Sequence, residues 1–215
     1  MELLEFVPAE SKAILDVGCG SGAFGSLCKK KNNAHITGLE FNESCKTSAE
    51  AVLDNVVIGD ANETILGFDD ACFDLIICND FLEHIVDPVG FLGNASRKLR
   101  PDGSLLCSIP NFRYLENLIN LLVKKDFHYQ DSGILDNTHL RFFTEKSIKR
   151  LFRELGMKVI LFRGINTIRG FRISLLKPVL RLLNSGDVVH PQFVILARKQ
   201  AGKPGKSFEL PVICH

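Results

Sequence analysis

A glycine-rich turn close to the N-terminus has the residue types and spacing of a cofactor-binding loop. The apolar run 13–17 contains one acidic residue, Asp16, and is followed by Gly18, Gly20 and Gly22. Because glycine has no side chain, this backbone can turn tightly and approach a ligand closely. The Asp16 carboxylate can orient the loop or face a cation. The pattern indicates a nucleotide-type cofactor site at the carboxyl end of a first strand.

Two further carboxylates follow later apolar runs. Glu40 follows the run 35–39 and can accept hydrogen bonds from both hydroxyls of a ribose. Asp60 follows the run 55–58 and can accept a hydrogen bond from an exocyclic amine. The carboxyl ends of parallel strands meet at one edge of a sheet, so we expect both carboxylates beside the glycine-rich loop. The alternative interpretation is a pair of solvated carboxylates without a ligand.

A second group of reactive residues follows the apolar run 73–78. It contains Asp80, Glu83 and His84, and a further histidine, His139, lies later in the chain. A histidine can act as the general base that takes the proton of a hydroxyl acceptor. The same side chains can hold a divalent cation that polarises the acceptor hydroxyl instead. The third interpretation is that both histidines are structural.

The elements that position these residues are short strands alternating with helices. Such alternation predicts a largely parallel sheet covered on both faces. Asp87 and Thr144 are expected to cap two of the helices, and Gly156 to end the second one. We expect strands at 13–17, 34–39, 55–58, 73–78, 103–109, 157–163 and 191–198, and helices at 23–31, 43–53, 88–99 and 145–155.

The interval 111–143 is too long for a plain loop. Leu115, Leu118, Ile119 and Leu122 recur in it at helical spacing, so it contains a helix. It follows the fifth strand on the cofactor side of the sheet. We interpret it as a lid or substrate-recognition insertion, with a helix that merely extends the core as the alternative.

Composition places the chain among ordinary globular proteins. Its 215 residues are 46% hydrophobic and 24% charged with a net charge of +1, which suits one domain and makes nucleic acid a poor partner. The seven cysteines are scattered and indicate thiols in a reducing cytoplasm. The N-terminus lacks the features of a signal peptide, and no stretch is apolar enough to span a bilayer.

The C-terminal third holds two further features. Residues 168–183 carry four basic side chains among aliphatic ones. We interpret them as a helix packed on the sheet, with contact to a membrane surface as the alternative. Residues 1–200 are expected to form one domain, and residues 201–215 a flexible tail.

The combination resembles the class I S-adenosylmethionine-dependent methyltransferases over roughly residues 10–200. This resemblance implies a Rossmann-like, doubly wound α/β sheet of seven strands with the last strand antiparallel. Gly18, Gly20 and Ala23 also match the dinucleotide pattern, so a nicotinamide-dependent oxidoreductase is one alternative, although it leaves Asp60 unexplained. A non-catalytic cofactor-binding protein is the other.

The resemblance implies a role for each residue around the cofactor S-adenosylmethionine. Glu40 would hold the ribose, Phe41 would lie against the adenine, and Asp60 would bind the adenine amino group. The glycine-rich loop would line the methionine part, with Asn79 and Asp80 near the sulfonium. The implied cofactor-binding residues are Asp16, Gly18, Cys19, Gly20, Gly22, Glu40, Phe41, Asp60, Ala61, Asn79, Asp80 and Phe81.

The acceptor side resembles two more specific groups. The Glu83–His84 pair and His139 resemble ubiquinone-biosynthesis and small-RNA O-methyltransferases, some of which hold a divalent cation. Asp80 stands where a glutamate is usual there, so we expect metal-free catalysis by Glu83, His84 and His139.

The run 133–144 and the end of the fifth strand resemble methyltransferases of surface-polysaccharide synthesis. Asn111 and Arg141 are therefore expected to bind the acceptor, with an Arg141–Asp136 ion pair as the alternative. We predict methyl transfer to a hydroxyl of a saccharide or other small molecule.

Overall fold

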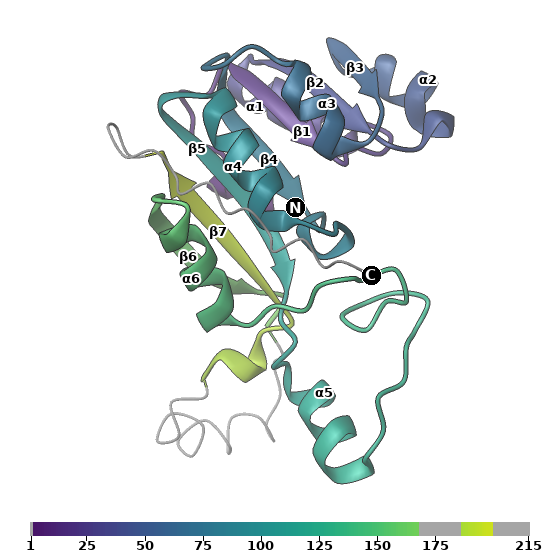
Figure 1. Ribbon diagram of the computed structural model, residues 1–215. Helices are drawn as coiled ribbons and strands as arrows, with labels where there is room; N and C mark the ends of the chain where they lie inside the picture. The colour runs from purple at the N-terminus through teal and green to yellow at the C-terminus, as the bar shows by residue number, and fades with distance from the viewer. Residues whose placement is uncertain (1, 168–185, 200–215) are drawn as a thin grey trace, which may run out of the picture.

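The computed structural model, which describes residues 2–167 and 186–199, contains one sheet of seven strands (Figure 1). All seven predicted strands are present, within a few residues of the expected limits. Their order across the sheet is β3-β2-β1-β4-β5-β7-β6. The strands are β1 (Ala13–Val17), β2 (His35–Glu40), β3 (Asn55–Ile58), β4 (Phe73–Asn79), β5 (Leu99–Pro110), β6 (Lys158–Ile165) and β7 (Gln192–Arg198).

The sheet is parallel from β3 to β5 and antiparallel at its other end. β1 pairs in parallel with both β2 and β4, so the strand order reverses at β1. β7 runs antiparallel to β5 and to β6, which confirms the predicted direction of the last strand. The point of reversal is where ligands bind in open α/β sheets, outside the carboxyl ends of the strands.

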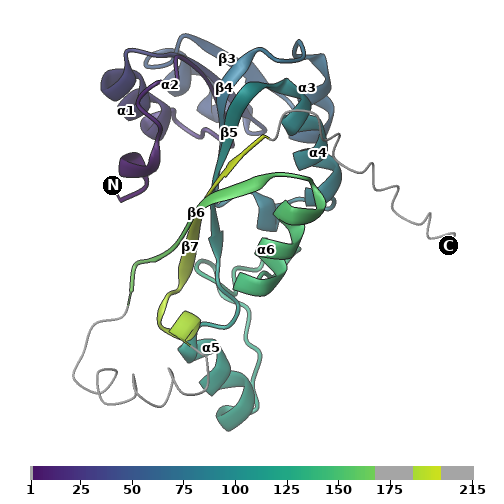
Figure 2. The ribbon, with the colours of Figure 1, turned by 90° about the vertical axis from the view of Figure 1, so that its left-hand side faces the viewer.

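Helices cover both faces of the sheet, with α1 and α2 on one face and α3, α4 and α6 on the other (Figure 2). The expected 43–53 helix is instead a 3₁₀ turn, Glu43–Cys45, followed by the short α2. α3 was not predicted, because seven residues are too few for a clear helical period. The helices are α1 (Ala23–Asn32), α2 (Lys46–Glu50), α3 (Ala61–Gly67), α4 (Pro88–Lys98), α5 (Leu115–Ile119) and α6 (Glu145–Glu154).

Two buried clusters, one on each face, hold these layers together. Adjacent residues of a strand point to opposite faces, so Ile14 belongs to the cluster under α1 and Leu15 to the cluster under α4 and α6. Both side chains are fully buried. This double burial explains why the strands are continuous apolar runs rather than alternating ones.

The helix ends follow the sequence closely. The Asp87 side chain accepts a hydrogen bond from the Gly90 amide at 2.9 Å, and Thr144 forms a reciprocal capping box with Ser147. Gly156 has a φ of +69°, as expected for a helix stop. β5 begins at Leu99, before the predicted 103–109 strand, and Asp102 inside it takes a left-handed conformation.

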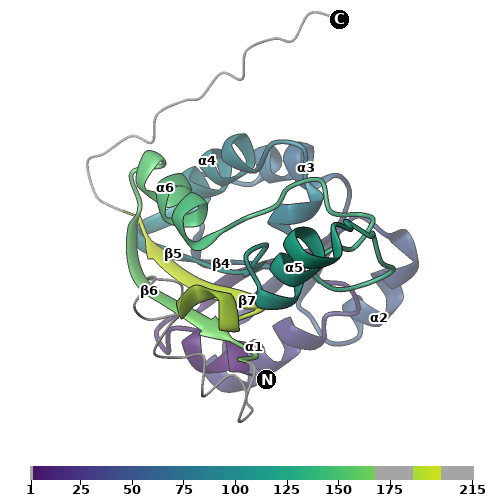
Figure 3. The same ribbon diagram turned by 90° about the horizontal axis from the view of Figure 1, so that it is seen from below.

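The 111–143 segment leaves the sheet after β5 and returns before α6. A bridge between Asn111 and Phe143 joins its two ends, and the Phe112 amide donates to the Phe143 carbonyl at 2.8 Å. The predicted helix is present as α5 and continues as a π-helical turn over Asn120–Lys124. α5 lies below the carboxyl ends of β4 and β5 in Figure 1, and Figure 3 shows it from below, on the side toward the viewer.

Some expectations fall outside the described residues, namely the 168–183 helix and the 201–215 tail. Within the described ranges, no helix has the length and hydropathy needed to cross a membrane. The six cysteines in those ranges are free thiols.

Candidate active site at the carboxyl edge of the sheet

The glycine-rich loop turns through three left-handed residues. Gly18, Gly20 and Gly22 have φ values of +68°, +53° and +78°, which residues with a side chain rarely adopt. A methyl group built on Gly20 would meet no atom within 4 Å, so this part of the loop faces open space. The Glu40 carboxylate accepts a hydrogen bond from the Gly20 amide at 2.8 Å. The end of β2 therefore fixes the loop in place.

Asp16 lies beneath this loop with only 3% of its surface exposed. Its Oδ2 atom has no hydrogen-bond partner among the described residues. Burial raises the pKa of Asp16 to about 7, and the nearby Glu40 carboxylate adds to the increase. Asp16 thus carries a proton for part of its time near neutral pH.

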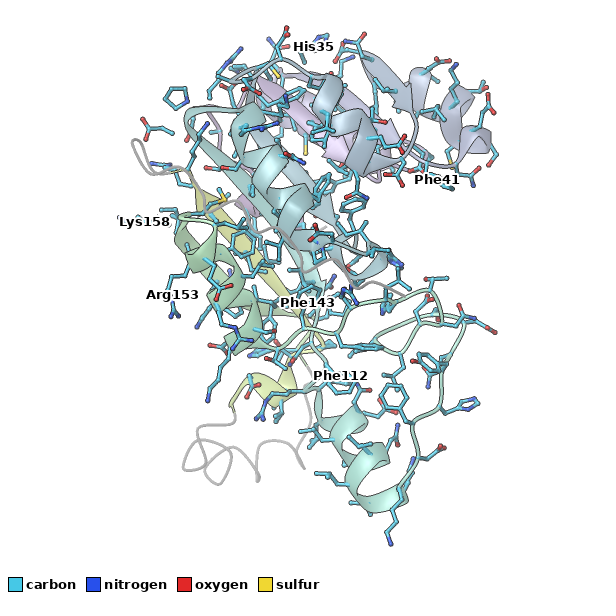
Figure 4. All side chains as sticks on the ribbon, viewed as in Figure 1. His35, Phe41, Phe112, Phe143, Arg153 and Lys158 are labelled. Atoms are coloured by element: carbon cyan, nitrogen blue, oxygen red, sulfur yellow. The ribbon has the colours of Figure 1, made fainter. Side chains whose placement is uncertain are left out.

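The remaining expected cofactor contacts lie along the same edge. Phe41, just beyond β2, is 76% exposed and lies at the edge of the sheet that faces the 111–143 segment, opposite His35 (Figure 4). Asp60 caps α3 by accepting from the Asn62 amide at 2.8 Å. The Oδ1 atom of Asn79 is buried without a partner among the described residues, so it can accept a hydrogen bond from a ligand.

The structure brings the three expected catalytic residues together. Glu83, His84 and His139, which we call the acid–histidine cluster, offer ligand atoms that all lie within 4.8 Å of one another. Glu83 and His84 belong to a 3₁₀ turn after β4, whereas His139 comes from the 111–143 segment. Backbone hydrogen bonds from Leu140 and Arg141 to the Glu83 carbonyl, at 2.7 and 3.0 Å, hold the two segments together.

Hydrogen bonds set the tautomers of both imidazoles. The Nδ1 atom of His139 lies 3.0 Å from the Ile134 carbonyl, which can only accept, so Nδ1 carries the proton. The Thr138 hydroxyl donates to Asp136 and therefore accepts from the Nδ1 atom of His84 at 3.1 Å. In the neutral form of each histidine, Nε2 therefore carries no proton, and its lone pair can act as a base. Sequence reasoning did not assign this role to Thr138.

Glu83 is 1% exposed, and neither of its carboxyl oxygens has a partner among the described residues. Burial, together with a smaller contribution from the Asp80 carboxylate, raises the pKa of Glu83 to about 8. An unpartnered buried carboxyl is costly unless a ligand satisfies it. Two Nε2 lone pairs and one such carboxyl therefore suit a divalent cation as well as a proton-transfer step.

A cavity of about 340 Å³ opens beside the acid–histidine cluster. Asp80 forms part of its wall, in a left-handed conformation with a φ of +46°. Three side chains that the sequence did not single out also line the cavity: Pro191, Asn166 and Gln192. The latter two come from the β6–β7 end of the sheet, and no motif in their neighbourhood marks them.

Two expectations for the acceptor side are corrected by the structure. Asn111 is fully buried, and its amide donates to the carbonyls of Asp187 and His190 at 2.9 and 2.8 Å. Its carbonyl oxygen accepts from the Arg113 amide, so its side chain is committed to the fold. The alternative ion pair of Arg141 is also wrong, because Arg141 donates to the Val86 carbonyl while Asp136 accepts from Thr138.

A glycine-rich loop at the point of strand reversal, with acidic strand ends beside it, defines a nucleotide-type cofactor site on a Rossmann-like fold. Comparison with known proteins agrees with this assignment of fold and site. Residues 1–161 match the family model of a methyltransferase domain. The chain is 32% identical over 165 residues to a ubiquinone biosynthesis O-methyltransferase of Coxiella burnetii (strain RSA 331 / Henzerling II), covering 74% of the chain and 69% of that protein. It is 25% identical over 164 residues to the enzyme of the same name from Neisseria meningitidis serogroup A, covering 72% and 67%.

Solved structures show the same fold. A SAM-dependent methyltransferase from Archaeoglobus fulgidus has 23% identity and a TM-score of 0.68, covering 92% of this chain and 91% of that one. The [4+2]-cyclase SpnF has 18% identity and a TM-score of 0.66, covering 94% and 81%. The fold alone therefore does not specify the reaction.

The chain belongs to the methyltransferase family that its domain matches: it is a class I S-adenosylmethionine-dependent methyltransferase, with S-adenosylmethionine as its cofactor. The residues present fit this cofactor. The open face at Gly20 leaves room for close backbone approach, and the Asn79 carbonyl oxygen is buried without a partner among the described residues. The comparisons give the oxidoreductase alternative no support.

Proposed function

We propose that the protein transfers the cofactor's methyl group to a hydroxyl oxygen of a small-molecule acceptor, with a saccharide as the first candidate. One observation carries this proposal: a cavity with a buried carboxyl and two imidazole lone pairs lies at the cofactor edge of the sheet. A hydroxyl is a weak nucleophile until its proton is taken, and this cluster supplies the proton acceptors. The similar proteins named as O-methyltransferases support the choice of oxygen.

The proposed cofactor contacts are the strand-end residues described above. Glu40 would accept from the ribose hydroxyls, Phe41 would stack against the adenine, and Asp60 would accept from its amino group. Asn79 would face the methionine end. The remaining proposed contacts lie in the glycine-rich loop and after β3 and β4: Asp16, Gly18, Cys19, Gly20, Gly22, Ala61, Asp80 and Phe81.

The proposed mechanism rests on Nε2 of His84 or His139. The Thr138 hydroxyl and the Ile134 carbonyl hold the Nδ1 protons, so each Nε2 is available to take the acceptor's proton. The bound cofactor supplies a methyl group already activated by its sulfonium charge. The protein's task is then to hold the acceptor oxygen close and in line while its proton leaves.

A cation-assisted version of the same reaction is the second candidate. Its support is the donor set itself, with one buried carboxyl and two imidazoles whose ligand atoms lie within 4.8 Å of one another. A divalent cation held there would lower the pKa of the acceptor hydroxyl.

The first experiment is calorimetric titration with S-adenosylhomocysteine, followed by a methyl-transfer assay on glycosides and catechols. Micromolar binding of S-adenosylhomocysteine and transfer to an oxygen are expected. Transfer to nitrogen or carbon acceptors alone would overturn the proposal.

We also propose a cytoplasmic location and an acceptor other than nucleic acid. The free thiols of the described cysteines suit a reducing compartment. The net charge of +1 gives no general attraction to nucleic acid.

A further inference from the structure

A chain of hydrogen-bonded polar side chains lines the same cavity as the acid–histidine cluster. Asn166, directly after β6, donates to the Gln192 side-chain oxygen at 3.0 Å. Gln192 lies at the start of β7, and its side-chain Nε2 donates to Oδ1 of Asp80. The Ser108 hydroxyl donates to the same Oδ1 atom at 3.2 Å. We call Asp80, Asn166 and Gln192 the amide wall, and all three line the 340 Å³ cavity.

Two members of the amide wall occupy left-handed backbone conformations. Asp80 and Asn166 have φ values of +46° and +55°, in the left-handed region that side chains seldom occupy. The Asp80 amide is held there by the hydroxyl and carbonyl of Ser108, at 3.1 and 3.2 Å. Among residues with a side chain, Asp and Asn adopt this region most readily, so these positions suit the turns after β4 and β6.

The amide wall has donors and acceptors left for a ligand after its internal hydrogen bonds are formed. The side-chain amides of Gln192 and Asn166 each use one of their two protons in these hydrogen bonds. The side chains of Asn166 and Asp80 each have one oxygen without a described hydrogen bond. The wall therefore offers alternating donors and acceptors over a short distance. Pro110 and Pro191, which also line the cavity, add flat apolar surfaces beside them.

This combination matches a compact ring that carries neighbouring hydroxyls. Vicinal hydroxyls both donate and accept, so they can pair with two carboxamides and a carboxylate at once. A planar phenol offers one or two polar groups and would leave the other members of the wall unpaired, which costs binding free energy.

We propose that Asn166 and Gln192 bind a polyhydroxylated, saccharide-type acceptor and thereby direct one of its hydroxyls toward the acid–histidine cluster. This inference rests on the proposed function, because it assigns the acceptor side of the same site. It adds two recognition residues from the antiparallel end of the sheet, outside the motifs that hold the cofactor.

Saturation-transfer NMR tests the inference with simple glycosides, because it detects weak binding of small sugars directly. The probes are methyl α-glycosides of glucose, galactose, mannose and rhamnose, with catechol as the planar phenol. Each is measured on the full chain, with and without S-adenosylhomocysteine. The variants are Gln192→Leu and Asn166→Ala, and Gln130→Leu, an exposed glutamine outside the cavity, is the matched control.

At least one glycoside is expected to show saturation transfer on the wild-type protein and on Gln130→Leu. A loss of at least fivefold is expected in Gln192→Leu and Asn166→Ala, with unchanged affinity for S-adenosylhomocysteine as the proof of folding. No glycoside signal on the wild type, or equal signals in all variants, would overturn the inference. Failure of S-adenosylhomocysteine to bind would instead count against the proposed function. The glycoside spectra measured without S-adenosylhomocysteine would still test the inference about Asn166 and Gln192.

Discussion

The imidazole rings of His84 and His139 lie edge to face, with their centroids 4.7 Å apart. One histidine follows β4 and the other comes from the 111–143 segment, so their contact depends on the fold of that segment. The backbone bonds from Leu140 and Arg141 to the Glu83 carbonyl maintain this contact. The segment is therefore part of the proposed reaction centre, because it supplies one of its bases.

Replacing either histidine should impair transfer and leave cofactor binding intact. His84→Ala and His139→Ala each remove one Nε2 acceptor, so a decrease in kcat of about 10²–10⁴-fold is expected. The measurement is transfer of a labelled methyl group to an acceptor from the screen, together with calorimetry of S-adenosylhomocysteine. His128→Ala, an exposed histidine of the same segment, is the control. Full activity in both variants would remove the histidines from the mechanism.

Glu40→Ala should weaken binding of S-adenosylhomocysteine. The substitution removes the proposed acceptor for the ribose hydroxyls and the observed bond to the Gly20 amide. Loss of hydrogen bonds to a charged group costs about 1.5–3 kcal/mol, which corresponds to roughly 10–150-fold in Kd. Calorimetry measures the change, with exposed Glu43→Ala as the control. An unchanged Kd would refute the ribose assignment.

Chelation distinguishes the two versions of the mechanism. With a histidine as the base, activity should persist after dialysis against EDTA. With a cation, EDTA should abolish activity, added Mn²⁺ or Mg²⁺ should restore it, and Glu83→Gln should not be restored. Transfer rates before and after dialysis provide the measurement, and metal analysis of the dialysed protein confirms removal.

The buried carboxyl of Asp16 should make the cofactor-free protein less stable as pH rises. Its pKa is about 7 in the folded state against 3.8 as the ordinary value, so the folded state retains a proton that the unfolded state releases. This contribution is complete below pH 4 and is lost as the pH rises toward 7, by about 1.4 kcal/mol per pH unit. Urea unfolding at pH 5, 6 and 7 measures it. Asp16→Asn should flatten this part of the profile; parallel profiles would show that Asp16 does not titrate there.

Asn111→Ala should destabilise the protein and leave its affinity for S-adenosylhomocysteine unchanged. The substitution leaves the carbonyls of Asp187 and His190 without their amide donor in a buried site. A cost of about 2–4 kcal/mol in the free energy of unfolding is expected. Denaturant unfolding tests this, with Asn94→Ala, at a half-buried position of α4, as the reference. A loss of acceptor binding without loss of stability would restore the ligand role first expected for Asn111.

The strand pattern and the cofactor edge were predictable because their signals are local. Continuous apolar runs, a glycine-rich turn and the acidic residues near the ends of β1 to β4 are short local patterns, and a parallel sheet places them at one edge. The helix caps at Asp87 and Thr144 are equally local, since capping depends on residues three positions away. The short α3 was missed because its seven residues carry too little periodicity.

The sequence by itself therefore determined the fold class and the identity of the three residues of the acid–histidine cluster. Only the tertiary structure decided that Asn111 supports the fold, that Thr138 holds the His84 tautomer, and that Gln192 reaches Asp80. Each of these depends on contacts between segments far apart in the chain. Such contacts leave no periodic pattern or short motif in the sequence, because they arise only when β7 inserts beside β5 and the 111–143 segment returns to Glu83.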